Sequence, residues 1–376
     1  MRASAFLYPW DVVGDPAAPA TVAGLGVQQV TLASAYHSTR ALTPRHPTGR
    51  IVTAPHSAVY YPPSGERWRG RALRPHGQSW IPAVDPFGDA ADALTAAGLE
   101  VHAWVVLAHN SLLGRAVPRC TVENAYGERY PWALCVAQAE VVEYCVSLAV
   151  EASVRPGARG VELESCGWYG LAHLHAHDKI GGVGLGPVGQ LLMSLCFCPA
   201  CERGYGLREK ARAAVREALE PLWRGAPEPA TGCEADGLAA LLGPGPASAV
   251  LAHRLRAARE LQHTVIGAVR AAAGPDFRIL LHADPDPWRY GANVGVDVGW
   301  VLDHADGLVV PAALAARASA VPRRPGTVIA ANSTVVAGMG GGAPVPDVPG
   351  ADELRLYHVG LASDADLATL RAVLRP

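Results

Sequence analysis

The sequence predicts an α/β protein, specifically a (β/α)8 TIM barrel with long insertions after the second and fourth strands. Eight short runs of apolar and β-branched residues recur along the 376-residue chain, and most read as parallel strands buried on both faces. Segments with helical patterns separate several of these runs. The chain is 50% hydrophobic and 18% charged, which is enough apolar material for a large core. We expect one barrel domain over residues 1–376.

The expected strands cover residues 4–10, 27–36, 99–110, 159–165, 277–284, 307–313, 327–333 and 354–363. The expected helices cover residues 16–26, 89–98, 136–152, 208–223, 248–273 and 364–374. The helix over 248–273 has the clearest signals, with Ser248 as its expected N-cap and Gly274-Pro275 as its stop. An open, doubly wound sheet is the alternative, because residues 338–353 are too rich in glycine and proline for a good helix. Against it, no glycine-rich phosphate turn follows the first strand.

Two connections are unusually long, at about residues 37–88 and 166–247. In a barrel, both would follow the carboxyl ends of strands and lie on the catalytic face. Long connections on that face usually help to build a substrate pocket.

Charge and hydropathy exclude several kinds of partner. The net charge is −2 and no block of like charge occurs, so we expect neither nucleic acid nor an anionic membrane as a partner. No apolar run approaches the roughly 18 residues of a membrane-spanning helix. The first residues lack the pattern of a signal peptide, and we expect a cytoplasmic protein. In a reducing compartment, thiols or metal ligands are the expected state of the eight cysteines.

Three cysteines fall close together in the sequence Cys196-Phe-Cys198-Pro-Ala-Cys201. Turns of the backbone can aim three such thiolates at one point, and zinc takes four ligands in a tetrahedron. A fourth ligand would have to come from elsewhere in the chain. The alternative is that these cysteines are small, buried apolar side chains.

This cysteine motif follows the fourth strand, and a further cysteine opens a helix upstream, in NAYGERYPWALCVAQAEVVEY. With these two features the sequence resembles the family 42 β-galactosidases and the family-10-like glycosyl hydrolases. The resemblance extends over about residues 99–205. It implies a structural zinc ion held by Cys135, Cys196, Cys198 and Cys201, with Cys120 as the alternative fourth ligand. It also implies a glycoside hydrolase whose partner is a small soluble saccharide or glycoside; assembly into a homo-oligomer stays open.

Two glutamates lie near the end of the fourth expected strand. The period of two along a strand puts Glu162 and Glu164 on the side that faces the barrel axis, with Glu164 nearer the mouth. The resemblance implies that Glu164 is the proton donor, and Trp168 and Tyr169 could keep it partly desolvated. A structural carboxylate paired with an arginine is the alternative interpretation.

Glycoside hydrolysis normally needs a second carboxylate. The family has a glutamate at the end of the seventh strand, where this sequence has Asn332. Asp284, after the fifth expected strand, is the best remaining candidate, and Asp286 and Asp11 are weaker ones. Retention and inversion both stay open, and a non-catalytic carbohydrate-binding barrel is the alternative function.

Side chains with polar edges and flat rings near the strand ends could bind the hydroxyl groups and the apolar face of a sugar. The residues expected to do so are His37, His109, Asn110, Trp168, Tyr169, His175, His282 and Asn332. The histidines from His173 to His177 could instead form the centre of a metal-dependent hydrolase. A barrel amidohydrolase, however, carries its His-x-His pair on the first strand, whereas here the pair follows the fourth.

Overall fold

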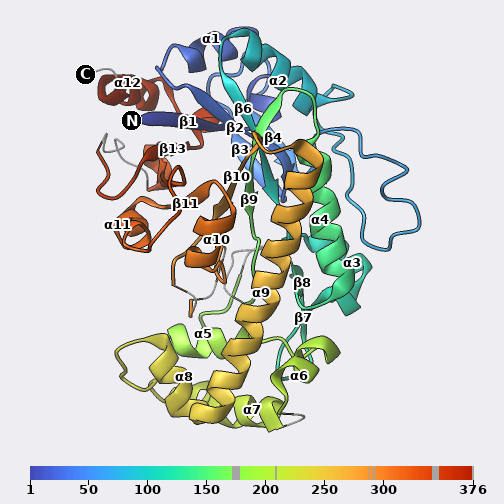
Figure 1. Cartoon of the computed structure of the whole chain (residues 1–376), viewed down its shortest axis with the longest axis vertical. Coiled ribbons are helices and arrows are strands. Elements are labelled where there is room, and N and C mark those ends of the chain that lie inside the picture. Colours follow the sequence, from blue (N-terminus) through green and yellow to red (C-terminus); the bar gives the residue numbers. More distant parts are fainter. Residues whose placement is uncertain are drawn as a thin grey trace.

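Eight parallel strands close into a barrel, which lies in the upper half of the molecule in the view of Figure 1. The computed structural model describes residues 1–171, 178–207, 210–286, 288–289, 291, 293–340 and 347–374. Because β1 pairs in parallel with both β2 and β13, the eight strands close on themselves, so the predicted barrel is confirmed and the open sheet is wrong. Around the barrel the strands are β1 (Arg2–Leu7), β2 (Gln29–Tyr36), β6 (Glu100–Val106), β9 (Ala158–Glu164), β10 (Arg278–His282), β11 (Gly307–Pro311), β12 (Val328–Thr334) and β13 (Glu353–Tyr357).

Helices follow most of the barrel strands and cover the outside of the barrel, and the described residues between β12 and β13 contain only a 3-10 turn. The helices are α1 (Ala18–Ala23), α2 (Pro86–Ala96), α4 (Ala139–Ser153), α9 (Pro244–Ala273), α10 (Val298–His304), α11 (Ala315–Ser319) and α12 (Asp364–Leu374). Short 3-10 turns are η1 (Pro9–Asp11), η2 (Pro118–Cys120), η3 (Ala312–Leu314), η4 (Ala337–Met339) and η5 (Val359–Leu361). No helix in the described ranges is both long enough and apolar enough to cross a bilayer.

Several predicted boundaries are wrong, including the ends of the first and third strands, which stop at Leu7 and Val106, and two of the errors have a local reason. Helix α9 begins at Pro244, so the expected N-cap, Ser248, lies inside the helix. The position before the helix is Gly243, and Pro244 suits the first turn because its fixed φ is already helical. The last strand was expected to reach residue 363 but ends at Tyr357, because His358 adopts a left-handed φ of +69°.

The two long connections contain secondary structure of their own. Between β2 and α2 lie the antiparallel hairpin β3 (Thr39–Leu42) and β4 (Ile51–Ala54), followed by β5 (Ala58–Val59), which pairs with β2. Between β9 and α9 lie α5 (Pro187–Met193), α6 (Pro199–Tyr205), α7 (Lys210–Trp223) and α8 (Glu234–Leu242). The connection after β6 adds α3 (Ser111–Ala116) and the antiparallel pair β7 (Thr121–Glu123) and β8 (Arg129–Leu134). The division into one domain with insertions at 37–88 and 166–247 stays a prediction.

Helix α9 contributes to two separate apolar clusters. Toward its C-terminal end, residues such as Leu261 and Val265 pack into the main core around the barrel. Toward its N-terminal end, Val250 and Leu251 pack with α5–α8 and the cysteines. Figure 1 shows α9 running from the helices at the bottom of the view up along the barrel.

The inside of the barrel is polar on one side and apolar on the other. Leu280, Val309 and Ala330 form a small cluster on the apolar side. On the polar side, the imidazole of His102 lies against Gly160 of the neighbouring strand, where an added Cβ would come within 2.6 Å of the ring. Glycine in the middle of β9 therefore makes room for a buried histidine.

Candidate active site and four-cysteine group

A buried ion pair lies inside the barrel below the mouth. Arg355 on β13 donates from Nε to Oε1 of Glu162 at 2.8 Å and from Nη1 to Oε2 of Glu353 at 2.9 Å. The rings of His102 and His282 each approach a Glu162 oxygen to 3.7 Å. Burial alone would raise the pKa of Glu162, but the charge of Arg355 and the two histidines hold that pKa well below its ordinary value. Glu162 and the predicted sugar ligand His282 thus belong to one buried polar network.

Glu164, the last residue of β9, occupies an aromatic setting. Its side chain is only 9% exposed, and Nε1 of Trp104 donates to its Oε2 at 2.7 Å. The tyrosines Tyr36, Tyr169 and Tyr357 lie around it. Burial is the largest cause that raises the pKa of each phenol, and the nearby Glu164 charge is among the other causes that raise it. These phenols therefore stay neutral and can donate hydrogen bonds at any physiological pH.

The backbone directly after Glu164 is held in a sparsely populated conformation. Ser165 has φ +57°, and its N–H donates to Oδ1 of Asn293 at 2.9 Å. Asn293 is itself left-handed, with φ +65°. Such conformations persist only where surrounding contacts fix them, so the end of β9 is a defined turn that orients the Glu164 side chain.

The predicted second carboxylate, Asp284, follows β10, the strand next to β9. It is half-buried, and its Oδ1 accepts the backbone N–H of Asp286 at 2.9 Å. Asp286 forms ion pairs with Arg317, at 3.4 Å, and with Arg289, at 3.8 Å. Of the two carboxylates, Asp284 is the one without an arginine partner among the described residues.

Asp11, after β1, is buried and has a different environment. Its Oδ2 accepts the backbone N–H of Tyr8 at 2.8 Å, while its Oδ1 is buried without a hydrogen bond from any described residue. Burial raises the pKa of Asp11 to about 7, although the Tyr8 N–H and the Arg45 charge oppose this shift. Arg45 comes from the 37–88 connection and donates to the carbonyl oxygens of Val359, Gly360 and Ala362.

Two of the predicted substrate-binding histidines belong to the aromatic cluster at the mouth. His37 stacks on Tyr36, with ring centroids 4.1 Å apart, and meets His109 edge-on at 5.2 Å. His109 stacks on Tyr169 at 5.0 Å. The structure therefore links both histidines to rings that surround Glu164.

The remaining predicted ligands differ in their positions. Asn110 is the N-cap of α3, where its Oδ1 accepts the N–H of Leu113 at 3.0 Å, so its amide oxygen is engaged in the fold. Asn332 is half-buried on β12, and its Oδ1 has no hydrogen-bond partner in the part of the chain that the structure describes. His175, with the rest of the cluster from His173 to His177, lies outside the described residues.

Four cysteines from two parts of the chain come together next to the barrel. Cys135 follows β8, Cys196 and Cys198 precede α6, and Cys201 lies in α6. All four are buried, and their Sγ atoms lie within 4.8 Å of one another, with Cys135 3.7 Å from Cys198 and 3.5 Å from Cys201. Sulfurs that bind one zinc ion tetrahedrally at about 2.3 Å are about 3.8 Å apart, so the group has the size of a metal site. Cys120 stands outside it and donates to Glu140 at 3.1 Å.

The thiols of this group shift one another's protonation. Contacts with neighbouring thiols, together with burial, raise the pKa of Cys135 and of Cys201. Hydrogen bonds from the other three cysteines lower the pKa of Cys198. Because metal ligands are thiolates, an ion that binds here would have to displace protons from the group. A buried four-cysteine group of this kind could hold a metal ion.

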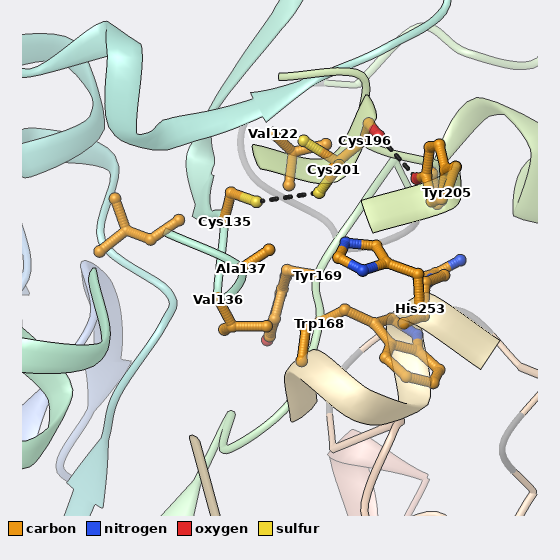
Figure 2. Close-up of a pocket in the computed structure, with 14 residues that line it drawn as sticks. Val122, Cys135, Val136, Ala137, Trp168, Tyr169, Cys196, Cys201, Tyr205 and His253 are labelled. Atoms are coloured by element: carbon orange, nitrogen blue, oxygen red, sulfur yellow. Dashed lines mark hydrogen bonds between the residues drawn. The ribbon is translucent and has the colours of Figure 1, made fainter. Parts of the chain in front are cut away.

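A small pocket with a cavity volume of about 30 Å³ is lined by three of the four cysteines, Cys135, Cys196 and Cys201 (Figure 2). Trp168, predicted to bind sugar, lines this pocket, and its ring packs over Gly295, where an added Cβ would lie 2.6 Å from the indole. The Arg254 guanidinium carbon lies 4.3 Å from the centroid of the Trp168 ring. Tyr169 lines the same pocket and also contacts His109. The indole of Trp168 is therefore packed beside the cysteines.

Three residues of the site were missed at the level of sequence, and each carried a signal. Trp104 follows His102 by two positions and shares its side of β6, so alternation pointed it into the barrel. Arg355 stands between two leucines of a buried strand, which is typical of an internal ion pair. Arg254 interrupts the apolar stripe of α9 between Leu251 and Ala258.

Comparisons with known proteins identify the fold. Neither a protein-family model nor a curated protein matches the sequence. Among solved structures, the catalytic domain of a β-amylase from Paenibacillus polymyxa has a TM-score of 0.57 at 10% identity, with 99% of this chain and 97% of that chain covered. The PgaB (BpsB) glycoside hydrolase domain from Bordetella bronchiseptica has a TM-score of 0.53 at 15% identity, with 99% and 98% covered.

A third solved structure is similar over only part of its length. The α-L-fucosidase isoenzyme 2 from Paenibacillus thiaminolyticus has a TM-score of 0.53 at 10% identity, and the match covers 99% of this chain and 48% of the fucosidase. This chain thus spans about half the length of that enzyme. At these identities the similarity is one of fold, and the chain has the TIM-barrel fold that all three solved proteins share with it.

Proposed function

We propose that the protein is a glycoside hydrolase in which Glu164 donates a proton to the leaving glycosidic oxygen. The observation that carries the proposal is the setting of Glu164: a nearly buried carboxyl group at the end of a barrel strand, held by Trp104 and surrounded by neutral phenols. In TIM barrels, chemistry takes place at the carboxyl ends of the strands. A carboxyl group shielded from water is suited to acid–base work on a glycosidic bond.

Two further features support a saccharide as the substrate. The three solved proteins of similar fold are named as a β-amylase, a glycoside hydrolase domain and a fucosidase. Rings and imidazoles, including Tyr36, His37 and His109, gather near Glu164 and offer both flat apolar faces and polar edges.

Asp284 is the proposed second carboxylate. It follows the strand adjacent to β9 and has no arginine partner among the described residues, so its charge is available at the mouth. In the proposed reaction, the Glu164 proton goes to the leaving oxygen as the bond to the anomeric carbon breaks, and Asp284 either attacks that carbon or takes a proton from the attacking water. Asp11 is less suited to this role, because a pKa of about 7 keeps it largely protonated in weak acid.

The four-cysteine group is proposed to hold a structural zinc ion. Cys135, Cys196, Cys198 and Cys201 would supply four thiolates and leave no open position, so the ion would serve as a cross-link. It would fasten the start of α6 to the chain that leads from β8 into α4.

A non-catalytic carbohydrate-binding barrel is the second candidate. The observation in its favour is Asn332, which stands on the seventh barrel strand where the resemblance implies a nucleophilic glutamate. Its buried amide oxygen has no partner within the described ranges and could accept a hydrogen bond from a sugar hydroxyl.

The test is turnover of a panel of chromogenic glycosides by the full chain and by Glu164→Gln. We expect the variant to lose about 100- to 10,000-fold in kcat while the dissociation constant, measured by calorimetry, changes little. Glu143→Gln on α4, an exposed glutamate paired with Arg71 at 3.0 Å, is the matched control. A wild-type chain that binds saccharides without any turnover would favour the binding barrel. A Glu164→Gln variant with full activity would refute the assigned role.

A further inference from the structure

A buried arginine without an acidic partner lies beside the four-cysteine group. Arg254 on α9 is 6% exposed, and both its Nη1 and Nη2 are buried without a hydrogen-bond partner. In the described part of the chain, no carboxylate forms an ion pair with it. A buried and uncompensated charge is strongly destabilising, so a negative group has to be sought nearby.

The pocket around Arg254 contains further ring nitrogens without hydrogen-bond partners. Its lining includes Trp168 and His253, whose Nε1 and Nε2 atoms are also buried without partners. Cys135, Cys196 and Cys201 line the same pocket. In the view of Figure 2, the His253 imidazole lies between the cysteine sulfurs and the Trp168 indole.

The cysteines that line the same pocket are the groups whose negative charge could balance the Arg254 guanidinium. Burial lowers the pKa of Arg254 to about 10, while Tyr205 and the thiolate forms of Cys201, Cys196 and Cys135 oppose this shift. The three cysteines that most favour the charged guanidinium are the same three that line its pocket. Neutral thiols would not compensate a buried cation, whereas thiolates would.

We propose that Arg254 balances the negative charge of a metal ion bound by the four cysteines; this rests on the metal binding proposed above. One divalent ion with four thiolates carries a net charge of about −2, which is costly to bury away from water. The Arg254 guanidinium, which lines the same pocket as three of the cysteines, would offset half of that charge. Arg254 is therefore a positioning residue of the centre and makes no bond to the metal.

The same side chain joins the centre to the candidate active site. Its guanidinium stacks over Trp168, four residues after Glu164 in the sequence. Metal binding would hold Arg254 through its charge, and Arg254 would hold the segment that leaves β9. The centre would in this way stabilise the loop at the barrel mouth.

The experiment measures zinc affinity of the full chain by competition with a chromogenic chelator, and Co²⁺ binding by its thiolate charge-transfer absorption. We expect Arg254→Met to weaken zinc binding by about 10- to 100-fold, as loss of an outer-sphere partner does at other metal sites. Arg254→Lys keeps the charge and should recover most of the affinity. Arg256→Met, at an exposed position of the same helix, is the matched control and should bind like the wild type.

Thermal unfolding separates charge balance from a purely structural role. Without metal, Arg254→Met should be as stable as the wild type or more stable, because it removes an unpaired buried charge. With zinc, it should be less stable than the wild type. If Arg254→Met does not fold without metal, Arg254→Gln makes the same comparison with a polar, uncharged side chain.

Two results would overturn the inference in distinguishable ways. A wild-type chain that binds zinc with four protected thiols, and an Arg254→Met variant that binds it equally well, would refute charge balance alone. A wild-type chain that takes up neither Zn²⁺ nor Co²⁺ would refute the metal centre, and the inference with it.

Discussion

The buried carboxyl group of Asp11 makes a quantitative prediction about stability and pH. The perturbation is Asp11→Asn, which keeps the shape of the side chain and an oxygen that can accept the Tyr8 N–H. Gly360 packs so closely on Asp11 that an added Cβ would overlap a carboxylate oxygen, so water cannot enter from that side. The raised pKa of Asp11, about 7, follows from this burial.

The magnitude follows from the difference between the folded and unfolded states. Folding moves the pKa of Asp11 from 3.8 to about 7, and a shift of that size corresponds to about 4 kcal/mol. Because the folded pKa is the higher one, this stabilisation is fully present below pH 3.8 and is lost as the pH rises through about 7. Asparagine does not ionise. The stability of Asp11→Asn relative to the wild type should therefore increase by about 3 kcal/mol between pH 5 and pH 8.5, because the loss of about 1.4 kcal/mol per pH unit continues only up to the folded pKa of about 7.

The assay is urea unfolding of both proteins at a series of pH values between about 5 and 8.5, which bracket the window where the Asp11 proton is released. The difference between the two free energies of unfolding removes the contributions of other titrating groups. Asp303→Asn, at an exposed position of α10, is the control and should follow the wild-type profile. Parallel profiles for Asp11→Asn and the wild type would refute the claim that Asp11 is buried as a neutral carboxyl group.

Two further predictions concern the cysteines and the tryptophan at the mouth. Cys198→Ser should abolish tight zinc binding and lower the unfolding temperature, because zinc at 100 times its Kd contributes about 2.7 kcal/mol of stability. Elemental analysis measures the zinc content and thermal scans measure the unfolding temperature. Cys233→Ser, at an exposed cysteine, is the control. Unchanged metal content in Cys198→Ser would contradict the assignment. Trp104→Phe removes the N–H that donates to Glu164, a hydrogen bond worth about 1.5–3 kcal/mol. In steady-state kinetics, kcat should therefore fall by about 10- to 100-fold while KM changes little. An equal rise in KM would point to lost substrate binding instead.

The barrel could be predicted because parallel strands that are buried on both faces are continuous apolar runs. Segments such as 277–284 and 327–333 have this pattern, and each covers all or nearly all of a strand of the structure. Boundaries depend on single residues. Ser248 looks like an N-cap in isolation, but Pro244 already fits the first turn of α9, and packing of the earlier residues extends the helix.

The site was less predictable because it depends on contacts between distant strands. Alternation along one strand was enough to place Glu162 and Glu164 inside the barrel. It could not show that Arg355, from the last strand, neutralises Glu162 and so leaves Glu164 as the carboxylate with an aromatic environment. The role of Trp168 as a sugar ligand stays a prediction, and the sequence could not show that its ring lines the same pocket as three of the cysteines.

Helix α9 restricts how this protein can be redesigned. A helix of 30 residues is about 45 Å long, and its two halves are buried in different apolar clusters. Deleting the segment 166–243 would leave Ala247, Val250 and Leu251 uncovered at the free end of that rod. A minimal barrel would therefore need α9 shortened to the region around Ala258 as well, and a graft of the cysteine-bearing helices onto another barrel would have to carry the first half of α9 with it.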